Sequence, residues 1–167
     1  MRKELYWVDG SWPGKLAVAS RPRSGDWLKD DVAAWRRAGI SAVLSLLTPD
    51  EERDLDLCHE ASEVRRQGME FSSYPIPDRQ IPRSEANWAE VLEGINLSLL
   101  AGKNVVVHCR QGIGRSGLAA ACLLVKKGMS PGAAVESVSA ARGMSVPETV
   151  EQRDWIDHYA AALTSTK

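Results

Sequence analysis

The sequence has few of the features that mark secreted, membrane-spanning and metal-binding proteins. Its only cysteines are Cys58, Cys109 and Cys122, an odd and sparse set that makes a poor disulfide framework and fits a reducing compartment. No Cys-x-x-Cys or His-x-x-x-His spacing occurs, so no metal site is expected. The apolar run Ala119–Val125 is far shorter than the ~20 residues of a membrane-spanning helix.

An excess of positive charge is also missing. Lys and Arg total 21 against 22 Asp and Glu, which gives no support to nucleic-acid binding through overall charge. No apolar segment follows Met1 to form a secretory signal, and no repeat or long linker occurs. We therefore expect 1–167 to form a single cytoplasmic domain with no membrane or nucleic-acid partner. The sequence leaves the oligomeric state open, with a monomer as the expectation.

Short apolar runs alternate with helical patterns along the chain. The runs predict strands over 5–8, 16–19, 40–47, 69–74 and 105–107. Capping residues and apolar spacing predict helices over 28–38, 48–67, 84–102, 116–127 and 130–141, and Pro147 is expected to open a last helix that ends near 163. This alternation predicts an α/β or α+β fold with a buried sheet in the middle.

One segment, Val105–Gly117, combines a buried strand, a glycine-rich loop and a helix start. Gly112 and Gly114 allow the backbone to curl so that successive N–H groups point inward, and such a nest binds anions. The helix that follows directs its positive end to the same place. Arg115 adds a planar guanidinium that fits phosphate oxygens. Phosphate-binding residues are expected to be Arg110, Gln111, Gly112, Ile113, Gly114 and Arg115.

Cys109 lies in the same electrostatic field. Helix N-termini and nearby cations stabilise thiolates, so the loop would form a nucleophile beside the phosphorus atom that it holds. Cleavage of a phosphate monoester through a cysteinyl-phosphate then follows. Ser116 is positioned to donate to the thiolate as it leaves. We expect His108 to orient the loop rather than act as an acid, because it precedes the nucleophile on the strand and should face away from it.

A non-catalytic interpretation exists for the same residues. A strand, a glycine loop and a helix can bind phosphate without chemistry, and a buried cysteine is usually a small apolar core residue. The order of His108, Cys109, Gly112, Arg115 and Ser116 after an apolar strand favours the catalytic interpretation.

His108-Cys109-x5-Arg115-Ser116 resembles the signature of the cysteine-dependent protein phosphatases, and within them the small dual-specificity branch, closest to the cyclin-dependent kinase-associated phosphatases. The resemblance spans about 14–163. It implies a protein-tyrosine-phosphatase-like α/β fold in which helices flank a central, mixed and mostly parallel sheet. It also implies hydrolysis of phosphotyrosine, phosphoserine or phosphothreonine, or of a small phosphate ester, with no cofactor and no metal.

The resemblance further implies a general acid on a loop before the nucleophile strand. Asp78, in Pro75-Ile76-Pro77-Asp78, matches that aspartate; it would protonate the leaving oxygen and then activate water. Arg79 beside it is expected to be solvated, or to meet the phosphate or the acid. Many relatives carry Ile-Gln-Thr where this chain has Pro147-Glu148-Thr149, although Gln152 still matches. We expect Glu148 to point away from the phosphate and to serve a helix N-terminus.

Two other functions stay open on the sequence alone. One is a phosphate-binding module whose chemistry is weak or lost, which the presence of Cys109, Arg115 and Asp78 disfavours. The other is thiol-based arsenate or sulfur chemistry on the same loop, which would not need Asp78. No lysine lies inside the loop, which disfavours a highly charged inositol lipid as substrate.

Overall fold

The computed structural model describes residues 4–165 and is built around a five-stranded sheet in the order β1-β2-β5-β3-β4. The first two strands pair in antiparallel fashion, and every other pairing is parallel. The predicted mixed, mostly parallel sheet is therefore confirmed. The strands are β1 (Tyr6–Val8), β2 (Leu16–Ser20), β3 (Ile40–Ser45), β4 (Glu70–Ser73) and β5 (Asn104–Cys109).

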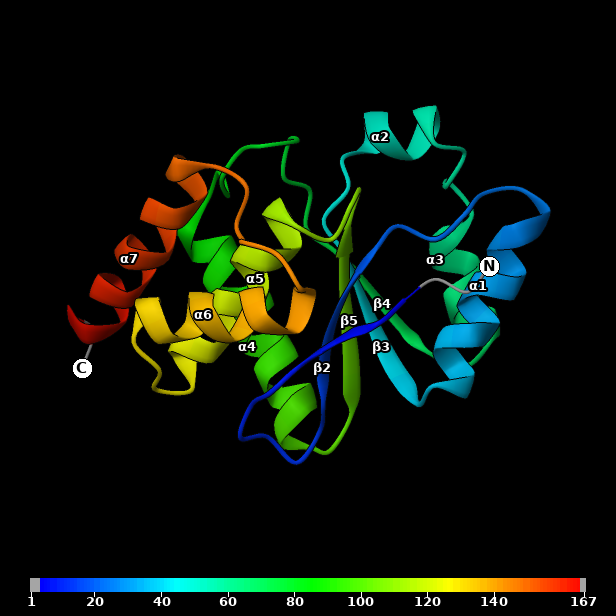
Figure 1. Ribbon diagram of the computed structural model, residues 1–167. Helices are drawn as coiled ribbons and strands as arrows, with labels where there is room; N and C mark the ends of the chain where they lie inside the picture. The colour runs from blue at the N-terminus through cyan, green and yellow to red at the C-terminus, as the bar shows by residue number, and fades with distance from the viewer. Residues whose placement is uncertain (1–3, 166–167) are drawn as a thin grey trace.

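Helices cover both faces of this sheet, as an α/β fold requires. Figure 1 shows α1 and α3 on one face, α4 to α7 on the other, and α2 beyond the end of the sheet where β5 stops. The helices are α1 (Asp26–Arg37), α2 (Pro49–Asp54), α3 (Glu60–Arg66), α4 (Glu85–Leu100), α5 (Gly114–Lys126), α6 (Pro131–Arg142) and α7 (Val150–Ser165). No helix among the described residues is long and apolar enough to cross a membrane.

Alternation along the central strand sends successive side chains to opposite cores. Val105, Val107 and Cys109 belong to the core under α4–α7, whereas Val106 belongs to the core under α1 and α3. All four are buried. The run of valines is apolar on both sides because β5 is covered on both faces. This places the Cys109 side chain on the face from which α5 departs.

The helix predicted over 48–67 is wrong, because the chain forms two short helices there. Thr48 caps α2 through a reciprocal pair with Glu51, as the cap prediction required. The helix then ends, Asp56 adopts a left-handed conformation with φ 55°, and Leu57 is fully buried in the core under α1 and α3. The helix is interrupted where Leu57 enters the core. The sequence pattern did not predict this interruption.

The start of the last helix also differs from the prediction. It begins at Val150 rather than at Pro147. The Thr149 hydroxyl accepts from the Gln152 backbone at 3.1 Å, and Gln152 Oε1 accepts from the Thr149 backbone at 3.2 Å. This reciprocal pair is a capping box. Pro147 therefore lies in the preceding loop, and Thr149 sets the first turn.

Candidate active site

The loop between β5 and α5 has the tight curvature that the glycines predict. Gly112 has φ 73°, a conformation that favours glycine. A Cβ on Gly112 would lie 2.6 Å from the Ala19 carbonyl carbon, because the loop packs against the end of β2. Helix α5 starts at Gly114, so its positive end faces the loop. The local sequence therefore shapes the loop, and β2 leaves no room for a side chain at its bend.

A small cavity of about 60 Å³ opens at this loop. It brings together residues that are far apart in the sequence: Asp78 from the β4–α4 loop, Cys109 from the end of β5, and Arg115 from the first turn of α5. None of the described residues that line it is aromatic. The lining residues are Asp78, Cys109, Arg110, Gln111, Gly114, Arg115 and Glu148.

Arg115 is buried and almost fully hydrogen-bonded. Its Nη1 donates to Glu51 Oε1 at 2.6 Å and to the Ile76 carbonyl at 2.8 Å. Its Nη2 donates to Glu51 Oε2 at 2.9 Å and to Asp78 Oδ1 at 3.2 Å. Burial acts to lower the pKa of Arg115, but the Glu51 hydrogen bonds and the charges of Cys109, Glu51 and Asp78 outweigh it and raise the pKa. The guanidinium is thus a fixed positive charge in the cavity wall.

Glu51 is a site residue that sequence reasoning missed. It holds the Arg115 guanidinium with both carboxylate oxygens and is itself buried. Burial acts to raise the pKa of Glu51, whereas the hydrogen bonds from Arg115 and the Thr48 backbone lower it, and the pKa ends below its usual value. The sequence signal was the capping box Thr48-x-x-Glu51, but nothing in it pointed to an arginine 64 residues away.

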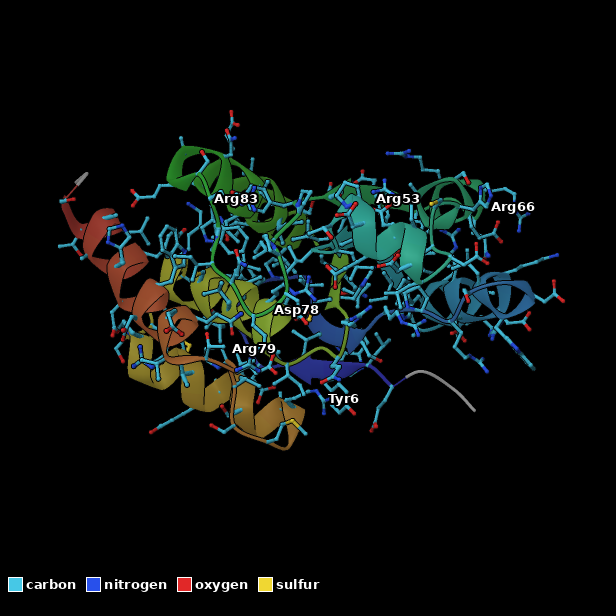
Figure 2. The ribbon with its side chains drawn as sticks, turned by 90° about the horizontal axis from the view of Figure 1, so that it is seen from above. Tyr6, Arg53, Arg66, Asp78, Arg79 and Arg83 are labelled. Carbon is cyan, nitrogen blue, oxygen red and sulfur yellow. The ribbon has the colours of Figure 1, made fainter. Side chains whose placement is uncertain are left out.

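Asp78 lies at the mouth of the cavity. Its side chain is half-exposed, at 51%, and contacts Arg115 Nη2. Figure 2 shows Asp78 and Arg79 next to each other on the loop that leads toward Arg83 and α4. The loop therefore brings a carboxylate to the edge of the cavity that Cys109 lines.

Ser116 and His108 do not line the cavity. Ser116 is fully buried, and its hydroxyl has no hydrogen-bond partner among residues 4–165. His108 points to the opposite side of the sheet, where its Nε2 lies 2.6 Å from Glu60 Oε2 and its ring lies against Trp35. Its Nδ1 reaches the Cys109 carbonyl at 3.4 Å. The expected outward direction of His108 is therefore observed.

The prediction for Glu148 is wrong in one respect. Glu148 does not point away from the site but lines the cavity, and its Oε1 accepts from Arg79 Nη1 at 2.7 Å. Arg79 is exposed, as one of the expectations had it, and it pairs with Glu148 rather than with Asp78. The positive charge of Arg79 offsets the negative charge of the Glu148 carboxylate in the cavity wall. Sequence spacing alone could not place two residues 69 positions apart beside each other.

The similarity to a known protein family covers most of the chain and not the loop alone. Residues 3–159 match the family described as Swiss Army Knife protein, DSP-PTPase phosphatase domain. The chain belongs to the DSP-PTPase family. It is thereby a member of the protein-tyrosine and dual-specificity phosphatases, as its signature predicted.

Curated relatives and solved structures agree with this membership. Cyclin-dependent kinase inhibitor 3 of Sus scrofa is 33% identical over 144 residues, which covers 83% of this chain and 68% of the relative. The Homo sapiens protein of that name is 27% identical over the same shares. Tk-PTP in its active form shares 27% identity with a TM-score of 0.78, covering 94% of this chain and 96% of its own.

A further solved structure supports the fold. Kinase associated phosphatase, with its catalytic cysteine replaced by serine, superposes with a TM-score of 0.90 at 21% identity. It covers 99% of this chain and 98% of its own. This confirms the predicted protein-tyrosine-phosphatase-like fold.

The other two cysteines of this DSP-PTPase are placed differently from Cys109. Cys58 is exposed, and Cys122 is fully buried in the core under α4–α7. Burial raises the pKa of the Cys122 thiol to about 12. Cys122 is therefore an apolar core residue, and all three cysteines are free.

Arg21 and Arg23, two arginines that follow β2, do not line the cavity. Arg23 pairs with Asp31 at 2.7 Å, which fixes the loop before α1. Arg21 lines a depression beside the cavity together with Arg110, Gln111 and Arg142. Ile113, predicted to bind phosphate, also lines that depression and not the cavity itself.

Proposed function

We propose that this DSP-PTPase hydrolyses phosphate monoesters of phosphoproteins through a cysteinyl-phosphate intermediate. The observation that carries the proposal is the cavity in which Cys109, Arg115 and Asp78 meet. A nucleophile, a fixed cation and a carboxylate within one small space are the groups that this chemistry needs.

In the first step the Cys109 thiolate attacks phosphorus. A sulfur–phosphorus bond forms, and the bond to the leaving oxygen breaks. Asp78 in its acid form gives its proton to that oxygen. Arg115, the backbone N–H groups of 110–115 and the start of α5 stabilise the charge on the other phosphate oxygens.

In the second step the Asp78 carboxylate takes a proton from a water molecule as that water attacks phosphorus. The sulfur–phosphorus bond breaks, phosphate leaves and the thiolate returns. The buried Ser116 hydroxyl has no hydrogen-bond partner among residues 4–165, and this supports a role in donating to the departing sulfur. His108, through its contact with the Cys109 carbonyl, supports the orientation of the loop.

Phosphoproteins are the proposed substrate class. The relatives named as a cyclin-dependent kinase inhibitor and as a kinase associated phosphatase support this choice. Within residues 4–165 no aromatic side chain forms a wall of the cavity, so we infer that phosphoserine and phosphothreonine enter as well as phosphotyrosine.

The test is hydrolysis of p-nitrophenyl phosphate in EDTA across about pH 4–8, with and without vanadate. We expect Cys109→Ser to abolish turnover. Asp78→Asn should lower kcat by about 10²-fold and remove the basic limb of the pH profile. Cys58→Ser and Asp54→Asn change exposed residues and are the matched controls. Their kcat and pH profile should equal those of the unmodified protein.

Two results would contradict the proposal. An inert protein that still binds vanadate at Cys109 would be a phosphate-binding module. Arsenate reduction or sulfur transfer at Cys109 that continues unchanged in Asp78→Asn, without ester hydrolysis, would indicate thiol chemistry.

A further inference from the structure

Three consecutive residues of the β4–α4 loop are each held by a partner from another part of the chain. Asp78 contacts Arg115 of the phosphate loop at 3.2 Å. Arg79 donates to Glu148 at 2.7 Å. The Gln80 carbonyl accepts from Gln152 Nε2 at 3.0 Å.

Two of these three partners come from one short segment before and within α7. Gln152 is fully buried, and its Oε1 also accepts from the backbone of Glu148 and Thr149 at 3.2 Å each. Glu148 is one-third exposed and Arg79 is more than half exposed. The helix cap thus anchors the Glu148 backbone firmly, while the ion pair itself lies at the surface.

The backbone of Arg79 has an uncommon conformation. It adopts φ 63°, in the left-handed region that a residue with a side chain rarely occupies. The Arg79 side chain is held by the ion pair with Glu148. The backbone of the next residue, Gln80, is held by the hydrogen bond from Gln152. The backbone that carries Asp78 is therefore held from its C-terminal side by the start of α7.

We propose that Glu148 is a positioning residue for the general acid, acting through Arg79 to hold Asp78 over Cys109. The inference rests on the proposed function, because it gives Asp78 the role of acid. A general acid works only within hydrogen-bond reach of the leaving oxygen, and a loop that opens takes it out of reach. Arg79 also neutralises the carboxylate that Glu148 places in the wall of the phosphate cavity.

This role predicts a dependence on the leaving group. An ester with a good leaving group depends less on the general acid than phenyl phosphate or a phosphoserine peptide does. We expect Glu148→Gln to lower kcat on p-nitrophenyl phosphate by less than about twofold. On phenyl phosphate we expect a loss of about fivefold, the upper range for a partly exposed ion pair.

The experiment measures kcat and KM for both esters over the full pH range. It compares Glu148→Gln, Arg79→Gln and the exchanged pair Arg79→Glu/Glu148→Arg. Glu151→Gln is the matched control, an exposed glutamate in the first turn of α7 for which no ion pair or side-chain hydrogen bond is present among residues 4–165. The exchanged pair should regain most of the kcat that each single variant loses. In the single variants, the loss should appear on the basic limb of the pH profile, which in the proposed mechanism depends on Asp78.

Several outcomes would overturn the inference. Equal losses on both esters would mean that Glu148 acts on the nucleophile or on folding. A lower KM with unchanged kcat in Glu148→Gln would show a carboxylate that only repels phosphate. Glu148→Gln matching Glu151→Gln, while Asp78→Asn falls as expected, would refute the positioning role and leave the proposed function intact. Undiminished activity in Asp78→Asn would instead refute the proposed function.

Discussion

At the residue scale, the site depends on the buried pair of Arg115 and Glu51. Each guanidinium nitrogen of the fork contacts one carboxylate oxygen of Glu51. This bidentate geometry fixes the plane of the guanidinium before any phosphate arrives. Asp78 shares Nη2 with Glu51, so an incoming phosphate oxygen competes with Asp78 rather than with Glu51. In the proposed mechanism this would free Asp78 to turn toward the leaving group.

Glu51→Gln should therefore reduce both stability and phosphate binding. Loss of one partner of a buried pair typically costs about 3 kcal/mol, and vanadate should bind more weakly because Arg115 is no longer held. The pKa of Glu51 lies below its usual value in the folded protein. Its contribution is thus complete above about pH 4.3 and is lost as pH falls through the folded pKa.

Thermal unfolding of the two proteins at several pH values measures this. The gap in Tm should be widest near neutral pH and should shrink below about pH 4. A gap that stays constant into the acid range would show that the charge of Glu51 contributes nothing. Glu52→Gln, at the half-buried neighbour, serves only as a control for phosphate binding, since burial raises the pKa of Glu52 itself.

At the element scale, the ends of helices decide the shape of the site. The capping box of α2 places Glu51, and the start of α5 faces the phosphate loop. The capping box of α7 uses Gln152, which also holds the Gln80 carbonyl. A change at the α7 cap should therefore be felt in the loop that carries Asp78.

Thr149→Ala removes the hydroxyl that accepts from the Gln152 backbone at 3.1 Å. We expect a loss of about 1 kcal/mol, which lowers Tm by about 2–4 °C in a protein of this size. Thr149→Ser keeps the hydroxyl and should restore most of the stability. Circular dichroism melts of the three proteins check this, and equal Tm values in all of them would show that the cap is not formed in solution.

At the scale of the whole molecule, the sheet separates two cores. Leu123 of α5 is fully buried on one face, and Leu57, between α2 and α3, is fully buried on the other. The loop that carries the proposed site follows the end of β5, the central strand of the sheet (Figure 1). Packing on both faces thus fixes the strand that ends in Cys109.

Leu57→Ala and Leu123→Ala should each lower the free energy of unfolding by about 2–5 kcal/mol. Because the sheet lies between them, their effects should add within about 0.5 kcal/mol in the double variant. Urea unfolding measures this, with Leu97→Ala, whose side chain is 56% exposed, as a control that should change little. A clear departure from additivity would show that the two cores are coupled through β5.

The sequence by itself determined the features whose causes are local. Apolar runs and caps gave most strands and helices, and the glycines, Arg115 and Cys109 gave the phosphate loop. These features depend on neighbours within a few residues. The sequence also yielded Asp78, but only through a resemblance, since its distance from Cys109 along the chain has no local cause.

Only the tertiary structure decided the contacts between distant segments. The local pattern predicted one continuous helix over 48–67, but burial of Leu57 divides this segment into α2 and α3. The pairing of Arg115 with Glu51 and of Arg79 with Glu148 depends on how β3, β5 and α7 bring their ends together. Opposite charges form an ion pair only when packing brings the two side chains close together. The distance between two side chains in the folded protein cannot be read from their positions in the sequence.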